Sequence, residues 1–133
     1  MLVLGVSAAL MISSVSRAAE AVSRPCEGNK TQNIDDYLET SNSSRRLDIY
    51  ELVPRDFEII PEIVEYAPKK IAPFRRVPSD AARVVFGEGQ FAMVVSSCRV
   101  VDPHGNVWIA TRDNGVLSYT KPEYLEPTSK SLP

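Results

Sequence analysis

Short β-prone runs separated by strong turn signals fill residues 81–125, and this pattern constrains the fold more than any other feature of the chain. Asp102-Pro103-His104-Gly105 has the residue types of a tight turn, and Asp113-Asn114-Gly115 is a strong β-hairpin signal. Several short strands at this spacing are typical of a small barrel or sandwich. Strands are expected at Arg83–Phe86, Phe91–Val101, Val107–Arg112 and Val116–Thr120, with a Pro-led closing turn over Lys121–Leu125. The sequence therefore predicts a mainly β fold.

The preceding segment, residues 45–73, is rich in proline. Because proline lacks a backbone N–H and fixes φ, prolines this frequent exclude long helices and central strands. We expect a Pro-rich extension of edge strands or polyproline-like pieces that packs on the later sheet. The prolines recur at positions 54, 61, 68 and 73, and the extended pieces are expected at Leu47–Val53, Phe57–Ile60 and Ile63–Tyr66.

Two polar segments flank this predicted unit. Residues 19–44 predict a tail or linker, apart from a weak helical hint at Ile34, Tyr37 and Leu38. Residues 128–133 predict a short C-terminal tail.

The N-terminus has the pattern of an export signal. Leu2–Val15 is apolar, and Ser16-Arg17-Ala18 places small residues where a signal peptidase cleaves. The apolar run is shorter than the roughly 20 residues of a membrane-spanning helix. No lysine or arginine precedes it, so a membrane anchor or a misassigned start are the alternatives. We expect a signal peptide over residues 1–18, a periplasmic or secreted protein, and no stable membrane insertion after cleavage.

Export bears on the two cysteines, Cys26 and Cys98. In an oxidising compartment an even number of cysteines most simply forms a disulfide. The bridge would tie the N-terminal tail to the later domain, and the alternative is two unpaired thiols.

Residues 71–127 contain a series of short motifs in a recognisable order. They are Arg75-Arg76-Val77-Pro78-Ser79, a turn glycine at Gly89, a strand at Ala92–Val95, then Val107-Trp108-Ile109, Gly115-Val116-Leu117 and Tyr124-Leu125-Glu126. In this order they resemble the opening motif, turn, second strand, Trp strand, Gly-Trp-Val strand and closing turn of the bacterial SH3-like domain, SH3b, of exported proteins. Val77 and Val116 depart from the pattern of that family, whose members carry glycine and a second tryptophan there. The resemblance implies a small SH3-like β-barrel over residues 74–127 that binds peptides, cell-wall fragments or protein partners.

Trp108, the only tryptophan, is the strongest binding candidate. On its alternating strand it shares a face with Arg112, and Tyr119 and Tyr124 would extend an exposed surface of the residue types that dominate recognition sites. The alternative is that Trp108 packs beneath the Pro-rich segment.

Catalysis finds little support in the sequence. Cys98 and His104 are the one candidate nucleophile–base pair, but neither stands in a recognisable motif. One histidine and two distant cysteines do not make a metal site, and the sequence shows no phosphate-binding loop. With 15 basic and 17 acidic residues the formal net charge is −2, which disfavours nucleic-acid binding. No metal, cofactor or nucleic-acid partner is predicted.

The sequence thus leads to an exported, non-catalytic module that binds a protein partner or peptidoglycan. The alternatives are a periplasmic inhibitor or immunity-type protein that blocks a secreted toxin or enzyme, and a small hydrolase. The oligomeric state is not predicted.

Overall fold

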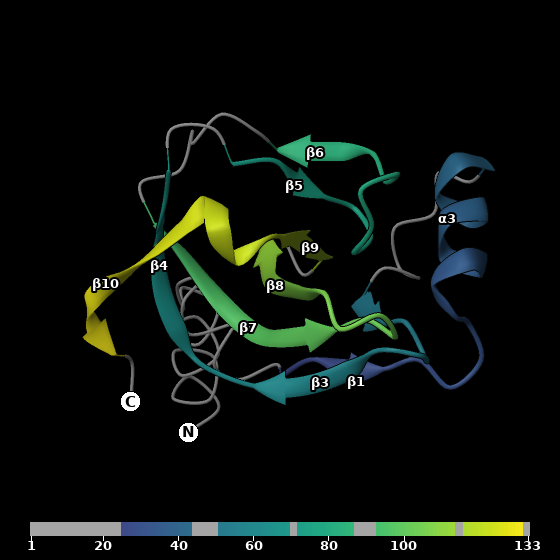
Figure 1. Cartoon of the computed structure of the whole chain (residues 1–133), viewed down its shortest axis with the longest axis horizontal. Coiled ribbons are helices and arrows are strands. Elements are labelled where there is room, and N and C mark those ends of the chain that lie inside the picture. Colours follow the sequence, from purple (N-terminus) through teal and green to yellow (C-terminus); the bar gives the residue numbers. More distant parts are fainter. Residues whose placement is uncertain (1–24, 44–50, 70–71, 87–92, 114–115, 132–133) are drawn as a thin grey trace, which may run out of the picture.

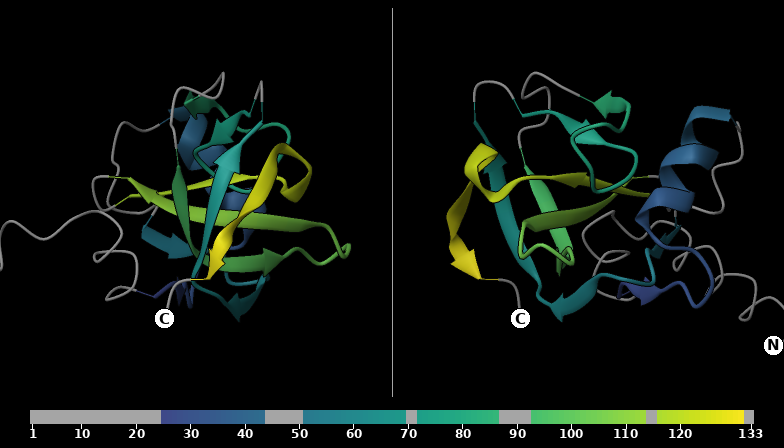
Figure 2. Two further views of the ribbon diagram at one scale, coloured as in Figure 1. Left: turned by 90° about the vertical axis from the view of Figure 1, so that its left-hand side faces the viewer. Right: turned by 45° about the vertical axis from the view of Figure 1, so that its right-hand side comes forward.

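A computed structural model describes residues 25–43, 51–69, 72–86, 93–113 and 116–131. Within these residues the fold is mainly β, as predicted. An antiparallel sheet curls strongly into a half-barrel, and one short helix lies beside it (Figures 1 and 2). The predicted signal peptide, residues 1–18, lies outside the described residues.

The middle of the sheet consists of β7 (Val94–Val101), β8 (Val107–Asp113) and β9 (Val116–Thr120). These strands pair antiparallel in chain order, with Asp113 opposite Val116 at the junction of β8 and β9. All three coincide with strands expected from the alternation of β-prone runs and turns. Asn114 and Gly115, the centre of the predicted hairpin turn, lie outside the described residues.

Two short strands share the other edge of β7. They are β3 (Glu58–Pro61) and β4 (Val64–Pro68). β3 pairs with the C-terminal half of β7, and β4 pairs with the residues at its beginning. Each strand ends in a proline. The expectation that the Pro-rich segment forms no central strand is wrong for β4, which lies between β7 and the C-terminal strand β10 (Leu125–Ser131), because its proline stands at the end of the strand and leaves the other N–H groups free to pair. The Pro-rich segment thus supplies strands to the sheet near the positions that its sequence predicted.

The sheet extends outward from both sides of this centre. β10 (Leu125–Ser131) pairs with β4 at one edge, while β5 (Phe74–Arg75) pairs with β9 and then with β6 (Val84–Phe86) at the other. The Pro-led closing turn is a short 3-10 helix, η2 (Pro122–Tyr124).

The C-terminal end differs from the sequence prediction. Residues 128–133 were expected to form a tail, whereas β10 continues to Ser131. The reason is pairing, because β4 offers an edge of backbone groups that this segment satisfies. Leu125, which begins the strand, also buries its side chain and is 4% exposed.

Residues 25–43 are also folded, in contrast to the expected tail or linker. β1 (Glu27–Gly28) runs parallel to β2 (Leu52–Val53), and helix α3 (Ile34–Ser43) follows. Asn33 caps the helix, since its Oδ1 accepts a 3.0 Å hydrogen bond from the Asp36 N–H. Tyr37 is fully buried and donates its hydroxyl to the Leu52 carbonyl at 2.7 Å. The weak helical hint at Ile34, Tyr37 and Leu38 was therefore the correct signal.

The central sheet carries buried side chains on both faces. One face joins the first core, which contains Val53, Phe57, Cys98, Val100, Trp108, Ala110, Leu117 and Tyr119. The other joins the second core, which contains Tyr66, Ala72, Phe74, Ile109 and Leu125. The Pro-rich and N-terminal segments cover the first core, and the curled sheet itself encloses the second.

A disulfide joins Cys26 to Cys98 across 72 positions of sequence, with the two Cα atoms 6.1 Å apart. The predicted pairing is confirmed. It fastens the N-terminal segment to β7 beside the first core. Such a bond suggests an oxidising, extracytoplasmic environment. Among the residues that the structure describes, no helix has the length and apolar character needed to cross a membrane.

Candidate binding site

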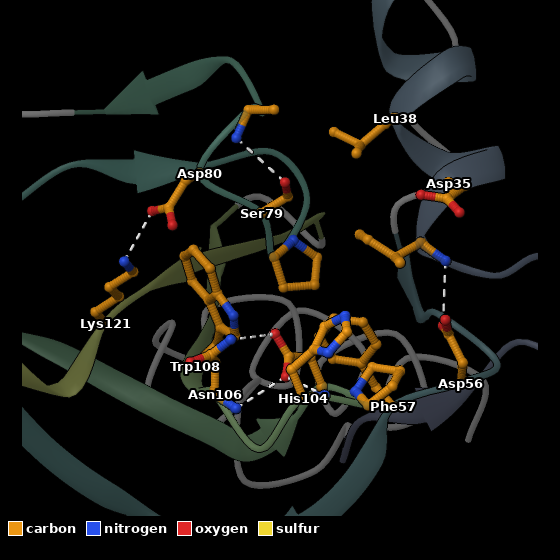
Figure 3. A pocket seen from close by; sticks show the side chains of 15 residues that line it. Asp35, Leu38, Asp56, Phe57, Ser79, Asp80, His104, Asn106, Trp108 and Lys121 are labelled. Atoms are coloured by element: carbon orange, nitrogen blue, oxygen red, sulfur yellow. Dashed lines mark hydrogen bonds and ion pairs between the residues drawn. The ribbon is translucent and has the colours of Figure 1, made fainter.

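A pocket of about 480 Å³ opens between helix α3 and one end of the half-barrel (Figure 3). Its walls come from separate parts of the chain: α3, the segment before β3, the loop between β5 and β6, the turn between β7 and β8, the start of β8 and the residue after β9. This volume lies in the range of ordinary small-ligand or peptide-segment sites. The pocket exists because the N-terminal segment folds onto the sheet.

Trp108 lines the pocket at the start of β8. Its side chain belongs to the first core and only 3% of the residue is exposed. Its indole Nε1 is buried and has no hydrogen-bond acceptor among the described residues. A buried donor left unpaired costs about 1–3 kcal/mol. Figure 3 shows the Trp108 ring between Lys121 and the wall that carries Phe57.

Lys121, which also lines the pocket, lies over the face of the indole ring. Its Nζ is 5.4 Å from the Trp108 ring centroid, within the range of a cation–π contact. The same Nζ forms a 2.8 Å ion pair with Asp80 Oδ1 (Figure 3). The hydrogen bond to Asp80 raises the pKa of the Lys121 ammonium. The ammonium therefore occupies a corner made of one carboxylate and one aromatic face.

Carboxylates dominate the charge of the pocket lining. Among the residues that the structure describes, Asp35, Asp56, Asp80 and Asp102 line the pocket, and Lys121 is the one ammonium among them. Asp56 accepts a 3.1 Å hydrogen bond from the Ile34 N–H at the start of α3, which fixes the helix to this wall. The pocket is therefore a region of negative potential.

The turn between β7 and β8 forms one wall. Asp102 Oδ1 accepts hydrogen bonds from the backbone N–H groups of His104 and Asn106 at 2.9 and 2.8 Å. Asp102 Oδ2 accepts a third from Asn106 Nδ2 at 3.0 Å. Gly105 has φ of 88°, a conformation that side chains other than glycine rarely adopt. Burial opposes ionisation of Asp102, but these three hydrogen bonds outweigh it and lower the pKa of its carboxyl. The turn predicted here is thus held by its own aspartate.

The predicted recognition residues do not form one exposed surface. Trp108 and Tyr119 are buried in the first core, at 3% and 1% exposure. Burial also raises the pKa of the Tyr119 hydroxyl. Arg112 is half-buried on β8, and Tyr124 is half-buried against the second core. The structure therefore places Trp108 and Tyr119 in the first core and Tyr124 against the second, so the four residues do not share one surface.

The outward placement of Trp108 is wrong, and packing beneath the Pro-rich segment is confirmed. Val53 and Phe57 of that segment belong to the same core as Trp108. The alternation along β8 was read correctly, since Trp108 and Ala110 face one core and Ile109 faces the other. The error lay in assuming that one of the two faces is exposed.

Sequence reasoning missed most of the pocket. Asp80 and Lys121 meet although 41 positions separate them, and neither belongs to a local motif. Asp35, Asp56 and Phe57 come from segments expected to be a tail or an extension. The one usable signal was Trp108, which is both rare and next to a turn.

Two other candidate chemistries can be placed in the structure. Cys98 Sγ is bonded to Cys26, so it is not a free nucleophile for His104, which lies exposed in the β7–β8 turn. Histidine, cysteine and acidic side chains do not gather in groups of three or more with metal-binding geometry anywhere in the described ranges.

Comparison with known proteins gives no match for this chain among protein-family models, curated proteins or solved structures.

Proposed function

We propose that this protein is an exported, non-catalytic binding module that recognises a protein partner or a cell-envelope component in the pocket beside Trp108. The observation that carries the proposal is the buried indole Nε1, which lacks an acceptor at the edge of a 480 Å³ pocket. A stable fold leaves few buried donors unpaired, and a ligand that displaces the atoms now covering this nitrogen and supplies an acceptor would remove this cost.

The proposed architecture is an SH3-like barrel of the bacterial type. Support comes from the order of the matching stretches along the sheet. Arg75–Ser79 begins in β5, Val107–Ile109 begins β8, and Val116 begins β9. Tyr124 ends η2, and Leu125 begins β10.

Periplasmic or secreted localisation is part of the proposal. The disulfide supports it, and so does the apolar segment over residues 2–15. In both compartments the protein would meet envelope components and secreted proteins.

Trp108 supplies the test, because as the only tryptophan it reports on the pocket through its fluorescence. We expect purified peptidoglycan fragments or a protein partner to change its emission on binding. A Trp108→Phe variant, which keeps an aromatic ring but loses the N–H, should bind less in a sedimentation or pull-down assay. Circular dichroism would verify that the variant is folded.

Tyr124→Phe is the matched control, since Tyr124 is an aromatic residue outside the pocket lining. It should bind as the wild type does. Equal binding by wild type and Trp108→Phe, together with unchanged emission, would overturn the proposed site. Retention on peptidoglycan would favour an envelope ligand, whereas one stoichiometric protein partner would favour the inhibitor or immunity-type alternative.

A further inference from the structure

We infer that the pocket binds a basic peptide segment of a protein partner, and that Lys121 occupies the place of the ligand's cationic side chain in the unliganded protein. The inference rests on the proposed function, because it takes this pocket as the binding site. It assigns the chemistry of the ligand and a competing role to one residue of the chain.

The Lys121 ammonium lies in a corner formed by the Asp80 carboxylate and the face of the Trp108 ring. Asp80 contributes a carboxylate 2.8 Å away, and Trp108 contributes an aromatic face with its centroid at 5.4 Å. A carboxylate beside an aromatic face is the environment that an ammonium or guanidinium group prefers. The structure thus shows that a cation fits this corner, because one of the chain's own cations lies there.

The charge around this corner is negative among the described lining residues. Asp35, Asp56 and Asp102 line the rest of the pocket, while Lys121 is already paired with Asp80. Asp35 belongs to the exposed first turn of α3, and Figure 3 shows it across the pocket from Asp80. A peptide with more than one basic residue would therefore meet carboxylates on both sides of the pocket.

The indole donor of Trp108 is buried without an acceptor, so a ligand atom can pair with Nε1 only if it displaces the atoms that cover it. The aspartates that line the pocket disfavour an anionic acceptor such as phosphate. A peptide carbonyl is a neutral acceptor. A basic peptide supplies this carbonyl and a cation together, whereas a phosphorylated ligand or nucleic acid supplies acceptors that the aspartates repel.

Exchange at the corner requires only a side-chain movement. The Lys121 side chain is 31% exposed, and that of Asp80 is 72% exposed. Lys121 can therefore turn into water while an incoming ammonium or guanidinium takes over its contacts. One cation leaves the site beside Asp80 and Trp108 and another takes its place, so the charge there stays constant. Lys121 therefore competes with the basic side chain of the ligand for these two contacts.

The test compares three capped heptapeptides by Trp108 fluorescence titration at low salt. The basic probe is Gly-Ser-Lys-Ser-Lys-Ser-Gly, and glutamine or glutamate replaces both lysines in the other two. We expect the basic peptide to bind best, with an affinity that falls as salt is added, because salt screens the charges. A muropeptide is titrated in parallel as the envelope ligand.

Two variants test the corner itself. Asp80→Asn should weaken binding of the basic peptide about threefold, and Lys121→Met should strengthen it about threefold, which is the scale of one exposed cation contact. Lys30→Met and Glu126→Gln are the matched controls, since both residues are exposed and outside the pocket lining. Both controls should leave the affinity unchanged.

The outcomes separate this inference from the proposed function. Binding of the muropeptide but not of the basic peptide would overturn the inference and leave the pocket as a binding site. A Lys121→Met variant that binds the basic peptide no better than wild type would overturn the competing role of Lys121. If none of the probes or envelope ligands binds, both proposals fail.

Discussion

The two larger cores of this molecule are closed in different ways, and a third, smaller cluster consists of Tyr37, Val77 and Ala82. The second core lies inside the curl of the sheet, and its members belong to strands or to the loops between them. The first core is covered from outside by Val53 and Phe57, with Cys26, Ile34 and Ile59 packed against it. The half-barrel thus encloses one face of its central strands, and a separate part of the chain has to cover the other.

Both faces of the central strands bury polar groups, and each face leaves some of them unpaired. Thr111 and Ser118, on the face opposite Trp108, satisfy each other through a 3.0 Å hydrogen bond between their hydroxyls. Thr120, which pairs with Ile109 of the second core, buries its Oγ1 without a partner among the described residues, as do Trp108 Nε1 and the Tyr119 hydroxyl of the first core. What distinguishes the first core is the pocket beside Trp108.

Removing the disulfide should have the largest effect on the first core, because this bond fastens the segment that covers it. The Cys26→Ser, Cys98→Ala double variant should lose about 4 kcal/mol of unfolding free energy, because the bond closes a loop of 72 positions. Urea unfolding measures the loss. The emission of Trp108 should also shift to longer wavelength in the folded variant, since the cover of the first core is no longer fastened. Wild-type stability and emission would show that the cover holds without the bond.

Truncating a side chain in the second core should lower the unfolding free energy nearly as much, but it should leave the emission of Trp108 unchanged. Leu125→Ala removes a side chain that is 4% exposed, and we expect a loss of about 3 kcal/mol in urea unfolding. The emission of Trp108 in the folded variant should stay unchanged, because Leu125 packs in the other core. Glu126→Gln, an exposed neighbour on β10, is the control and should cost little. A shifted emission would mean that the two cores are coupled.

Acid should produce the smallest effect, through the turn beside the pocket. The folded pKa of Asp102 lies below its ordinary value of 3.8, so the folded state binds fewer protons than the unfolded state at that carboxyl. Its contribution to stability is fully present above pH 3.8 and is lost as the pH falls through the folded pKa. Urea unfolding between pH 7 and pH 2 should therefore show a shallower decline for Asp102→Asn than for wild type. Parallel profiles would contradict the role of Asp102.

The sequence predicted the central strands well because their signals are local. The turn residues before β8 include Gly105, which adopts a positive φ in the structure. The alternating residues of β8 face two different cores, as their alternation indicates. The cysteine pair needed one further inference, from the export signal to an oxidising compartment. The positions of Pro61 and Pro68 at the ends of their strands follow from the missing N–H.

The pocket was beyond prediction because its contacts are long-range. α3 is mostly polar, and its place in the fold depends on Tyr37, which docks on the carbonyl of Leu52. The face of β8 that carries Trp108 was predicted to be exposed because its cover also comes from a distant segment. Alternation shows that a strand has two faces, but it does not show what packs on each face. Asp80 and Lys121 become neighbours only after β5, β6 and β9 have paired.

The disulfide also determines how the molecule would respond to a pulling force. Tension applied between residue 25 and residue 131 would pass from Cys26 directly to Cys98, because the covalent bond is the shortest route. The enclosed loop, with α3 and all strands before β7, would bear no load along its backbone. The part of β7 after Cys98, and then β8, β9 and β10, would lie in series with the force. Stretching would first peel these strands from their neighbours, and the segment over the first core would stay fastened to β7.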